Sequence, residues 1–165
     1  MDSTLIQAEV IDLLADTMGV GKQVAEITEL TMRGELSFTD SFIDRLAMLK
    51  GLNESVLNDI ADNISLMDGA ETLIKTLKSL GYKTAIISGG FTYFAGYLQR
   101  KLGIDYIHAN ELEIDNGKIT GQAKEPIINS ERKAKILQQL AFHEGLRLDQ
   151  VIAVGDGAND LAMLS

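Results

Sequence analysis

The sequence contains no cysteine among its 165 residues. This absence excludes a disulfide framework, a thiolate metal site and a cysteine nucleophile, so any catalysis must use oxygen and nitrogen groups. Long apolar runs are missing too. No stretch approaches the roughly 18 residues that a membrane helix needs, and the first residues lack the charged-then-apolar layout of a signal peptide. We therefore expect a cytoplasmic protein without a membrane partner.

Positive charge is scarce, with 15 lysines and arginines against 24 aspartates and glutamates and a formal net charge of -9. This balance disfavours binding to nucleic acid or to an anionic membrane through a basic patch. An acidic protein can still bind a phosphorylated metabolite if a divalent cation or a focused lysine offsets the charge at the site. With 45% hydrophobic residues, the chain is long enough for one core with a small insertion packed on it.

The first third of the chain has helical apolar spacing throughout. From Ala8 to about Ile64, apolar residues recur at intervals of three and four, with no strand-like stretch between them. Glycines such as Gly19 and Gly51 divide this stretch into about four short helices. Ser37-Phe38-Thr39-Asp40 has the pattern of a helix N-cap.

After Asp68 the pattern alternates between helices and strands. We expect helices over about 69–80, 90–103 and 130–144, and strands over 84–87, 106–107 and 151–154. Val151-Ile152-Ala153-Val154 is apolar at every position, which is typical of a strand buried on both faces. Asp115-Asn116-Gly117 separates two further short strands, and Asn-Gly favours a tight type I′ hairpin turn. Repeated strand-helix units predict a three-layered α/β fold with a parallel sheet.

Small and polar residues follow the expected strands, at the edge where open parallel sheets bind their ligands. They are Asp2-Ser3-Thr4, Ser88-Gly89-Gly90-Phe91 and Gly155-Asp156-Gly157-Ala158-Asn159-Asp160. Lys133 lies early in the helix that precedes the last expected strand. The order and spacing of these motifs resemble those of haloacid-dehalogenase-type phosphatases over nearly the whole chain.

This resemblance implies a Rossmann-like parallel sheet with a small helical cap inserted after the first motif. The core would comprise residues 1–8 and 66–165, and the four-helix cap residues 9–65. The family's first motif is usually Asp-x-Asp-x-Thr, and Met1 occupies its middle position. The nucleophilic aspartate would therefore precede Met1, and we expect the chain to be truncated at both ends. The alternative is a natural inactive fragment.

Asp2 would be the second aspartate of that motif, the general acid and then the general base. In a strand, a residue two positions from the nucleophile projects to the same side. Without the resemblance, Asp-Ser-Thr before Leu-Ile would equally fit a helix N-cap.

Asp156 and Asp160 lie in a glycine-containing loop, where carboxylates can reach a hard cation such as Mg²⁺. The resemblance implies that Asp156 is a direct ligand, together with the missing aspartate and the main-chain carbonyl of Asp2, while Asn159 and Asp160 support the site. The plainer interpretation is an ordinary acidic turn.

Ser88 and the amides around Gly89 and Gly90 lie at a strand-to-helix junction, which favours an anion. Phosphate oxygens would bind there, with Lys133 as the catalytic and substrate-binding cation. A plain turn is the alternative for Ser-Gly-Gly, and Lys133 taken alone would be a solvated helix lysine.

Glu9, Phe38 and Arg45 fall where phosphoserine phosphatases, within this family, carry their recognition residues. Arg45 would grip a carboxylate in bidentate fashion, and Glu9 would receive an ammonium group. The resemblance thus implies hydrolysis of O-phospho-L-serine through an aspartyl-phosphate, as in L-serine biosynthesis. The alternatives are another small-molecule phosphatase or phosphotransferase of the family, and a noncatalytic phosphate-binding module. Without the family, the two charges would lie on the surface and Phe38 in the core.

Overall fold

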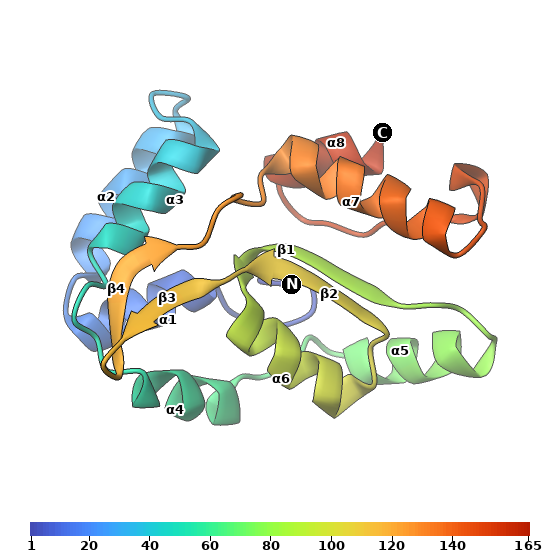
Figure 1. Cartoon of the computed structure of the whole chain (residues 1–165), viewed down its shortest axis with the longest axis horizontal. Helices are drawn as coiled ribbons and strands as arrows, with labels where there is room; N and C mark the ends of the chain where they lie inside the picture. Colours follow the sequence, from blue (N-terminus) through green and yellow to red (C-terminus); the bar gives the residue numbers. More distant parts are fainter.

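The computed structural model describes residues 1–165 as helices gathered around short strands (Figure 1). The helices are α1 (Val10–Met18), α2 (Gly21–Met32), α3 (Phe38–Ala47), α4 (Ser55–Asn63), α5 (Ala70–Ser79), α6 (Thr92–Leu102), α7 (Ser130–His143) and α8 (Leu161–Leu164). The strands are β1 (Ala85–Phe91), β2 (Tyr106–Asn110), β3 (Leu112–Asp115) and β4 (Lys118–Ala123). Two short 3₁₀ helices cover Leu148–Gln150 and Ala158–Asp160. No helix is both long enough and apolar enough to span a bilayer.

Helices α1 to α4 confirm the prediction of four short helices before residue 64. Local sequence explains their ends. Gly19 adopts a left-handed conformation with φ of 78° after α1, a position that favours glycine. At the start of α3, the Ser37 hydroxyl oxygen accepts a hydrogen bond from the Asp40 amide at 3.1 Å, as the N-cap pattern predicts.

Strands β1 and β2 form a parallel pair, with Ala85 opposite Tyr106 and Ile87 opposite His108. Helix α6 connects them, and in Figure 1 α6 and α7 lie on opposite sides of the pair. Strand β1 extends beyond the predicted end at residue 87, so Ser88, Gly89 and Gly90 lie in the strand itself.

The predicted hairpin is confirmed, with β3 and β4 antiparallel. Asn116 and Gly117 both have positive φ, 48° and 75°, as a type I′ turn requires. The hairpin also contacts the segment between α3 and α4, because the Gly51 amide donates to the Ile119 carbonyl at 2.8 Å. The hairpin therefore links the helical stretch to the rest of the chain.

The prediction of a strand over Val151–Val154 is wrong for this structure. The segment is assigned to no strand, and the side chains of Ile152 and Val154 are 71% and 66% exposed. A strand needs a neighbour that offers backbone donors and acceptors, and no segment pairs with this one. The parallel sheet is consequently limited to β1 and β2.

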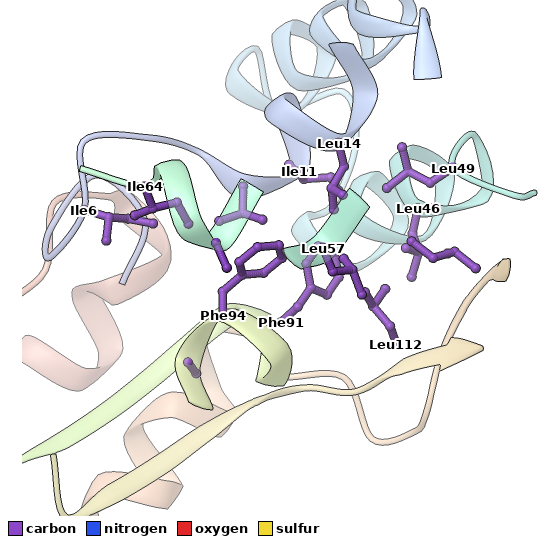
Figure 2. Close-up of a cluster of buried hydrophobic side chains, with 14 of the residues drawn as sticks. Ile6, Ile11, Leu14, Leu46, Leu49, Leu57, Ile64, Phe91, Phe94 and Leu112 are labelled. Atoms are coloured by element: carbon purple, nitrogen blue, oxygen red, sulfur yellow. The ribbon is translucent and has the colours of Figure 1, made fainter. Parts of the chain in front are cut away.

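A continuous core of 23 buried hydrophobic residues joins the helical stretch to β1 and α6. Figure 2 shows Phe91 and Phe94 beneath Leu57, with Leu46 and Leu112 beside them. The ring centroids of Phe42 and Phe91 lie 5.9 Å apart, so α3 packs directly on β1. The predicted boundaries at residues 8 and 65 pass through this shared core, and the division into core and cap stays a prediction.

Candidate functional site

The first residues form a tight turn. The Met1 carbonyl accepts hydrogen bonds from the amides of Leu5 and Ile6, at 2.8 and 3.2 Å. Asp2 caps no helix, since the N-cap of α1 is Glu9. The turn directs the Asp2 side chain toward the end of β1 instead.

The Asp2 carboxyl group is in an unusual environment. Its Oδ1 atom is buried without a hydrogen-bond partner. Burial raises the pKa of Asp2 from 3.8 to about 6, with the positive N-terminus acting against the rise and the charge of Glu9 adding to it. A carboxyl with this pKa can exchange a proton near neutral pH, as a general acid or base must.

Asp2 and Ser88 both lie against Gly90. A Cβ atom on Gly90 would lie 2.6 Å from Oδ2 of Asp2 and 3.2 Å from Oγ of Ser88. Ser88 is 4% exposed, and its Oγ accepts a hydrogen bond from the Gly90 amide at 2.9 Å. Glycine is therefore needed here, because a Cβ atom would clash with the Asp2 carboxyl group.

Lys133 of α7 forms a buried ion pair with Asp160. Nζ of Lys133 lies 2.7 Å from Oδ1 of Asp160, and the two side chains are 6% and 9% exposed. Oδ2 of Asp160 accepts from the amides of Asp156 and Gly157, at 3.2 and 3.4 Å. Burial acts to raise the pKa of Asp160, but Lys133 and the two loop amides bring it below its ordinary value. Both oxygens of Asp160 thus hold the loop and orient the lysine.

Asp156 and Thr4 connect the last motif to the first. The Thr4 hydroxyl donates a hydrogen bond to Oδ1 of Asp156, although the two residues are far apart in the sequence. Asp156 is exposed. The side chain of Asn159 lies over Gly157, where its Oδ1 would be 2.6 Å from an added Cβ atom.

The Met1 amino group lies among these charges. Burial lowers its pKa, while the charge of Asp2 raises it and that of Lys133 lowers it. The charges of Asp160 and Asp156 also raise it. Contacts link the same residues, because Thr4 of the N-terminal turn bonds to Asp156, and the Asp156 amide bonds to Asp160, the partner of Lys133. The structure therefore brings Asp2, Lys133, Asp156 and Asp160 to one place, next to the end of β1 that carries Ser88.

The predicted recognition residues lie on the helical side of this place. Nε of Arg45 donates to the Ser41 carbonyl at 3.2 Å, and its Nη1 donates to the Thr28 hydroxyl at 3.4 Å. Burial lowers the pKa of Arg45, and the charges of Asp12 and Glu9 act to raise it. Glu9 itself is exposed and accepts a hydrogen bond from the Ser3 hydroxyl at 2.5 Å.

Phe38 approaches the same strand end. Its Cζ atom would lie 2.9 Å from a Cβ atom on Gly89, so the ring covers that glycine. The structure thus places Phe38 of α3 against the segment predicted to bind phosphate. The roles assigned to this residue, to Glu9 and to Arg45 stay predictions.

No group of three or more histidine, aspartate or glutamate side chains is arranged to hold a metal ion. Oxygen donors of the kind that Mg²⁺ prefers are nevertheless present. Asp156 is exposed at the site, and no backbone amide donates to the main-chain carbonyl of Asp2. These two groups fit a hard cation in chemical type, but they need further ligands.

The sequence did not assign roles to two residues that contact this site. The sequence pattern places Thr4 only within the first motif and gives no signal of a role for Asn110. Asn110 is the last residue of β2, 2% exposed, and hydrogen bonds to the Gly89 carbonyl. Its place at the carboxyl end of a parallel strand was the available signal.

Comparison with known proteins shows which proteins the chain resembles. The family model of haloacid dehalogenase-like hydrolases matches residues 1–165. Phosphoserine phosphatase from Archaeoglobus fulgidus is 49% identical over 99% of this chain and 48% of its own length. Phosphoserine phosphatase from Haemophilus influenzae is 48% identical over 100% of this chain and 52% of its own length. The chain therefore spans about half the length of these relatives.

Solved structures agree with the sequence relatives. A HAD family hydrolase from Salmonella enterica serovar Typhi superposes with a TM-score of 0.96 at 40% identity, covering 99% of this chain and 57% of that one. A substrate-bound phosphoserine phosphatase complex gives a TM-score of 0.92 at 40% identity, covering 99% of this chain and 78% of that one. The arrangement of helices and strands is thus one that these hydrolases share.

Proposed function

The chain belongs to the haloacid dehalogenase-like hydrolase family, and on that premise we propose that the protein hydrolyses O-phospho-L-serine to L-serine and phosphate. The observation that carries the proposal is that Asp2 and Ser88 both lie against Gly90, while the loop that contacts Thr4 of the N-terminal turn also holds the buried Lys133–Asp160 pair. Asp2 would serve as the acid-base group, and Ser88 and Lys133 would bind the phosphate of a phosphomonoester during its hydrolysis. Relatives that are phosphoserine phosphatases support the choice of substrate.

Asp2 is the proton carrier in this proposal. An aspartate at the position before Met1, where the family motif has its nucleophile, would attack phosphorus as the bond from phosphorus to the serine oxygen breaks, and Asp2 would give that oxygen a proton. Water then attacks the aspartyl-phosphate, Asp2 takes the proton of the water, and phosphate leaves. Burial raises the pKa of Asp2, which suits a carboxyl group that gives a proton and then takes one. Dividing the displacement into two steps lowers each barrier.

Ser88 and Lys133 bind the phosphoryl group. The Ser88 oxygen accepts from the Gly90 amide, so its hydroxyl hydrogen can point to a phosphate oxygen. Lys133 supplies positive charge from a buried position, where Coulomb interactions are stronger than in water. Asp160 holds the lysine in place, and we assign it, with Asn159, a supporting position near the metal.

Mg²⁺ is the cation that we propose for the site. Asp156 and the main-chain carbonyl of Asp2 would hold it, with the preceding aspartate completing the protein ligands. The ion would neutralise phosphate charge and let an anionic nucleophile approach. Oxygen donors suit this hard cation.

Glu9 and Arg45 would select the amino acid. The two residues carry opposite charges, and the charge of Glu9 acts on Arg45. Serine carries its ammonium and carboxylate groups on the same carbon atom, so a pair of nearby opposite charges matches it. Phe38 would cover the phosphate end from α3, and closure of the helical stretch would exclude water. A charged metabolite of this kind does not cross a bilayer unaided, so we place the activity in the cytoplasm.

Phosphate release from phosphoserine in Mg²⁺ tests the proposal. We would compare the chain with a version extended upstream by an apolar strand that ends in aspartate, and with a matched extension that ends in asparagine. Only the aspartate version should turn over. An aspartate version that binds phosphoserine but releases no phosphate would identify a noncatalytic binding module instead.

Substrate preference needs a separate measurement. Phosphoethanolamine lacks the carboxylate that Arg45 would bind, and glycerol phosphate lacks both charged groups. Phosphoserine should be preferred over phosphoethanolamine, and Arg45→Met should remove that preference. Equal rates with all three would indicate another small-molecule phosphatase, and transfer to an added alcohol a phosphotransferase.

A further inference from the structure

Asn110 is a buried polar residue outside the motifs described so far. It ends β2, lies opposite Phe91 in the parallel pair and is 2% exposed. We infer that Asn110 is a positioning residue that sets the geometry of the phosphate-binding groups Ser88 and Lys133. The inference rests on the proposed function, because it assigns those two residues to one phosphate.

The Asn110 amide makes two hydrogen bonds to the backbone of other segments. Its Nδ2 donates to the Gly89 carbonyl at 2.8 Å. Its Oδ1 accepts from the Ile128 amide at 2.8 Å. One side chain therefore ties β1 to the segment that leads into α7. A buried polar group that satisfies both partners fixes their relative positions firmly.

The first hydrogen bond acts on Ser88 through one peptide unit. Because the peptide group is planar and trans, the carbonyl of Gly89 and the amide of Gly90 point in opposite directions. Asn110 holds that carbonyl, and the Gly90 amide donates to Oγ of Ser88 at 2.9 Å. Asn110 thus fixes the peptide that orients the serine oxygen.

The second hydrogen bond acts on Lys133 through the start of α7. Ile128 is buried and directly precedes Asn129, the N-cap of this helix. The Asn129 carbonyl accepts from the Lys133 amide at 2.9 Å, in the first turn. Anchoring Ile128 therefore fixes the position of the first turn of α7, and with it the backbone that carries the Lys133 side chain.

Only a side chain with a donor on one end and an acceptor on the other serves both contacts. The substitution Asn110→Asp removes the donor, because a carboxylate still accepts from the Ile128 amide but repels the carbonyl of Gly89. Displacements of about 1 Å in such a site cost up to about a hundredfold in rate. We therefore expect Asn110→Asp to weaken the binding of phosphate.

The test is the dissociation constant of inorganic phosphate in Mg²⁺, measured by titration calorimetry on the chain and its variants. Asn110→Asp should raise it about tenfold or more, and should raise KM for phosphoserine similarly in the version extended with aspartate. Asn63→Asp is the matched control. It removes a similar bond, from Nδ2 to the Asp59 carbonyl at 2.7 Å on the exposed side of α4, and should leave phosphate binding unchanged.

Thermal melting separates positioning from a merely structural role. A structural role lowers the Tm but leaves the phosphate dissociation constant of the folded fraction unchanged, and that result would overturn the inference. Asn110→Ser, which can keep at most one of the two bonds, serves if Asn110→Asp does not fold. If neither variant folds, the residue is structural and the inference fails. Absence of phosphate binding by the unsubstituted version that is extended with aspartate would instead refute the proposed function.

Discussion

Ile86 and Ile152 lie in two apolar runs of the chain that have opposite surroundings. Ile86 belongs to β1, pairs with Ile107 of β2 and is 5% exposed. Ile152 pairs with no strand and is 71% exposed. The two runs are similarly apolar, so composition does not explain the difference. A strand forms here only where a neighbouring backbone supplies hydrogen-bond partners. Comparing the two runs therefore measures how much this pairing and the burial that accompanies it contribute to stability.

The largest expected effect comes from the Lys133–Asp160 ion pair, which joins the loop that follows the run of Ile152 to α7. Lys133→Met should destabilise the protein by about 3–5 kcal/mol, because it leaves the Asp160 carboxylate buried and unpaired. Urea unfolding measures the change. Lys124→Met is the control, since the Lys124–Glu111 pair is 61% and 55% exposed and should contribute about 0–1 kcal/mol. Equal losses would show that the site pair is not buried in solution.

The comparison itself is tested by the same substitution in both runs. Ile86→Ala should cost about 3 kcal/mol, since it leaves a cavity beside the core. Ile152→Ala should change the free energy of unfolding by less than about 0.5 kcal/mol, because the side chain is already in water. Urea unfolding of both variants decides the matter. A large loss from Ile152→Ala would mean that its run is packed in solution.

The N-terminal turn contacts β1 through Asp2 and the loop over 155–160 through Thr4. The carboxyl group of Asp2 should make the free energy of unfolding depend on pH. The pKa of Asp2 is raised from 3.8 to about 6 in the folded state, so folding favours the protonated form. Its stabilising contribution is present below pH 3.8 and is lost as pH rises through about 6, on the order of 2 kcal/mol between pH 4 and 7. Melting in EDTA should show this fall, and Asp2→Asn should flatten it. A parallel fall in both proteins would assign it to other groups.

The smallest effect concerns the hydrogen bond from Thr4 to Asp156. Thr4→Val should cost about 1 kcal/mol and speed amide exchange in the loop over 155–160. Thr17→Val is the control, because its hydroxyl bonds only to the Leu13 carbonyl within α1. Unchanged exchange in the loop would show that Thr4 does not hold it.

Local patterns allowed much of the fold to be predicted. Helical periodicity located α1 to α4, and Asn116-Gly117 located the hairpin turn, because both depend on residues close in sequence. Val151–Val154 was predicted wrongly, because pairing depends on another segment. The strand-end rule pointed to Ser88 and Asp156, but Ser88 lies within β1 and no strand precedes Asp156, and the roles of both residues stay predictions. Asn110 was not found, since its bonds to Gly89 and Ile128 exist only once three distant segments meet.

The contact between Phe42 and Phe91 restricts how a substrate can enter. Swinging the whole helical stretch away from β1 would separate these rings and wet several core side chains, at a cost of about 2 kcal/mol or more for each large one. Helix α2 contributes only Val24 to the buried residues, and Met32 at its end is 84% exposed. The outer end of α2 is therefore the part of the helical stretch that can move with the least loss of buried apolar surface, while the contact between Phe42 and Phe91 stays intact.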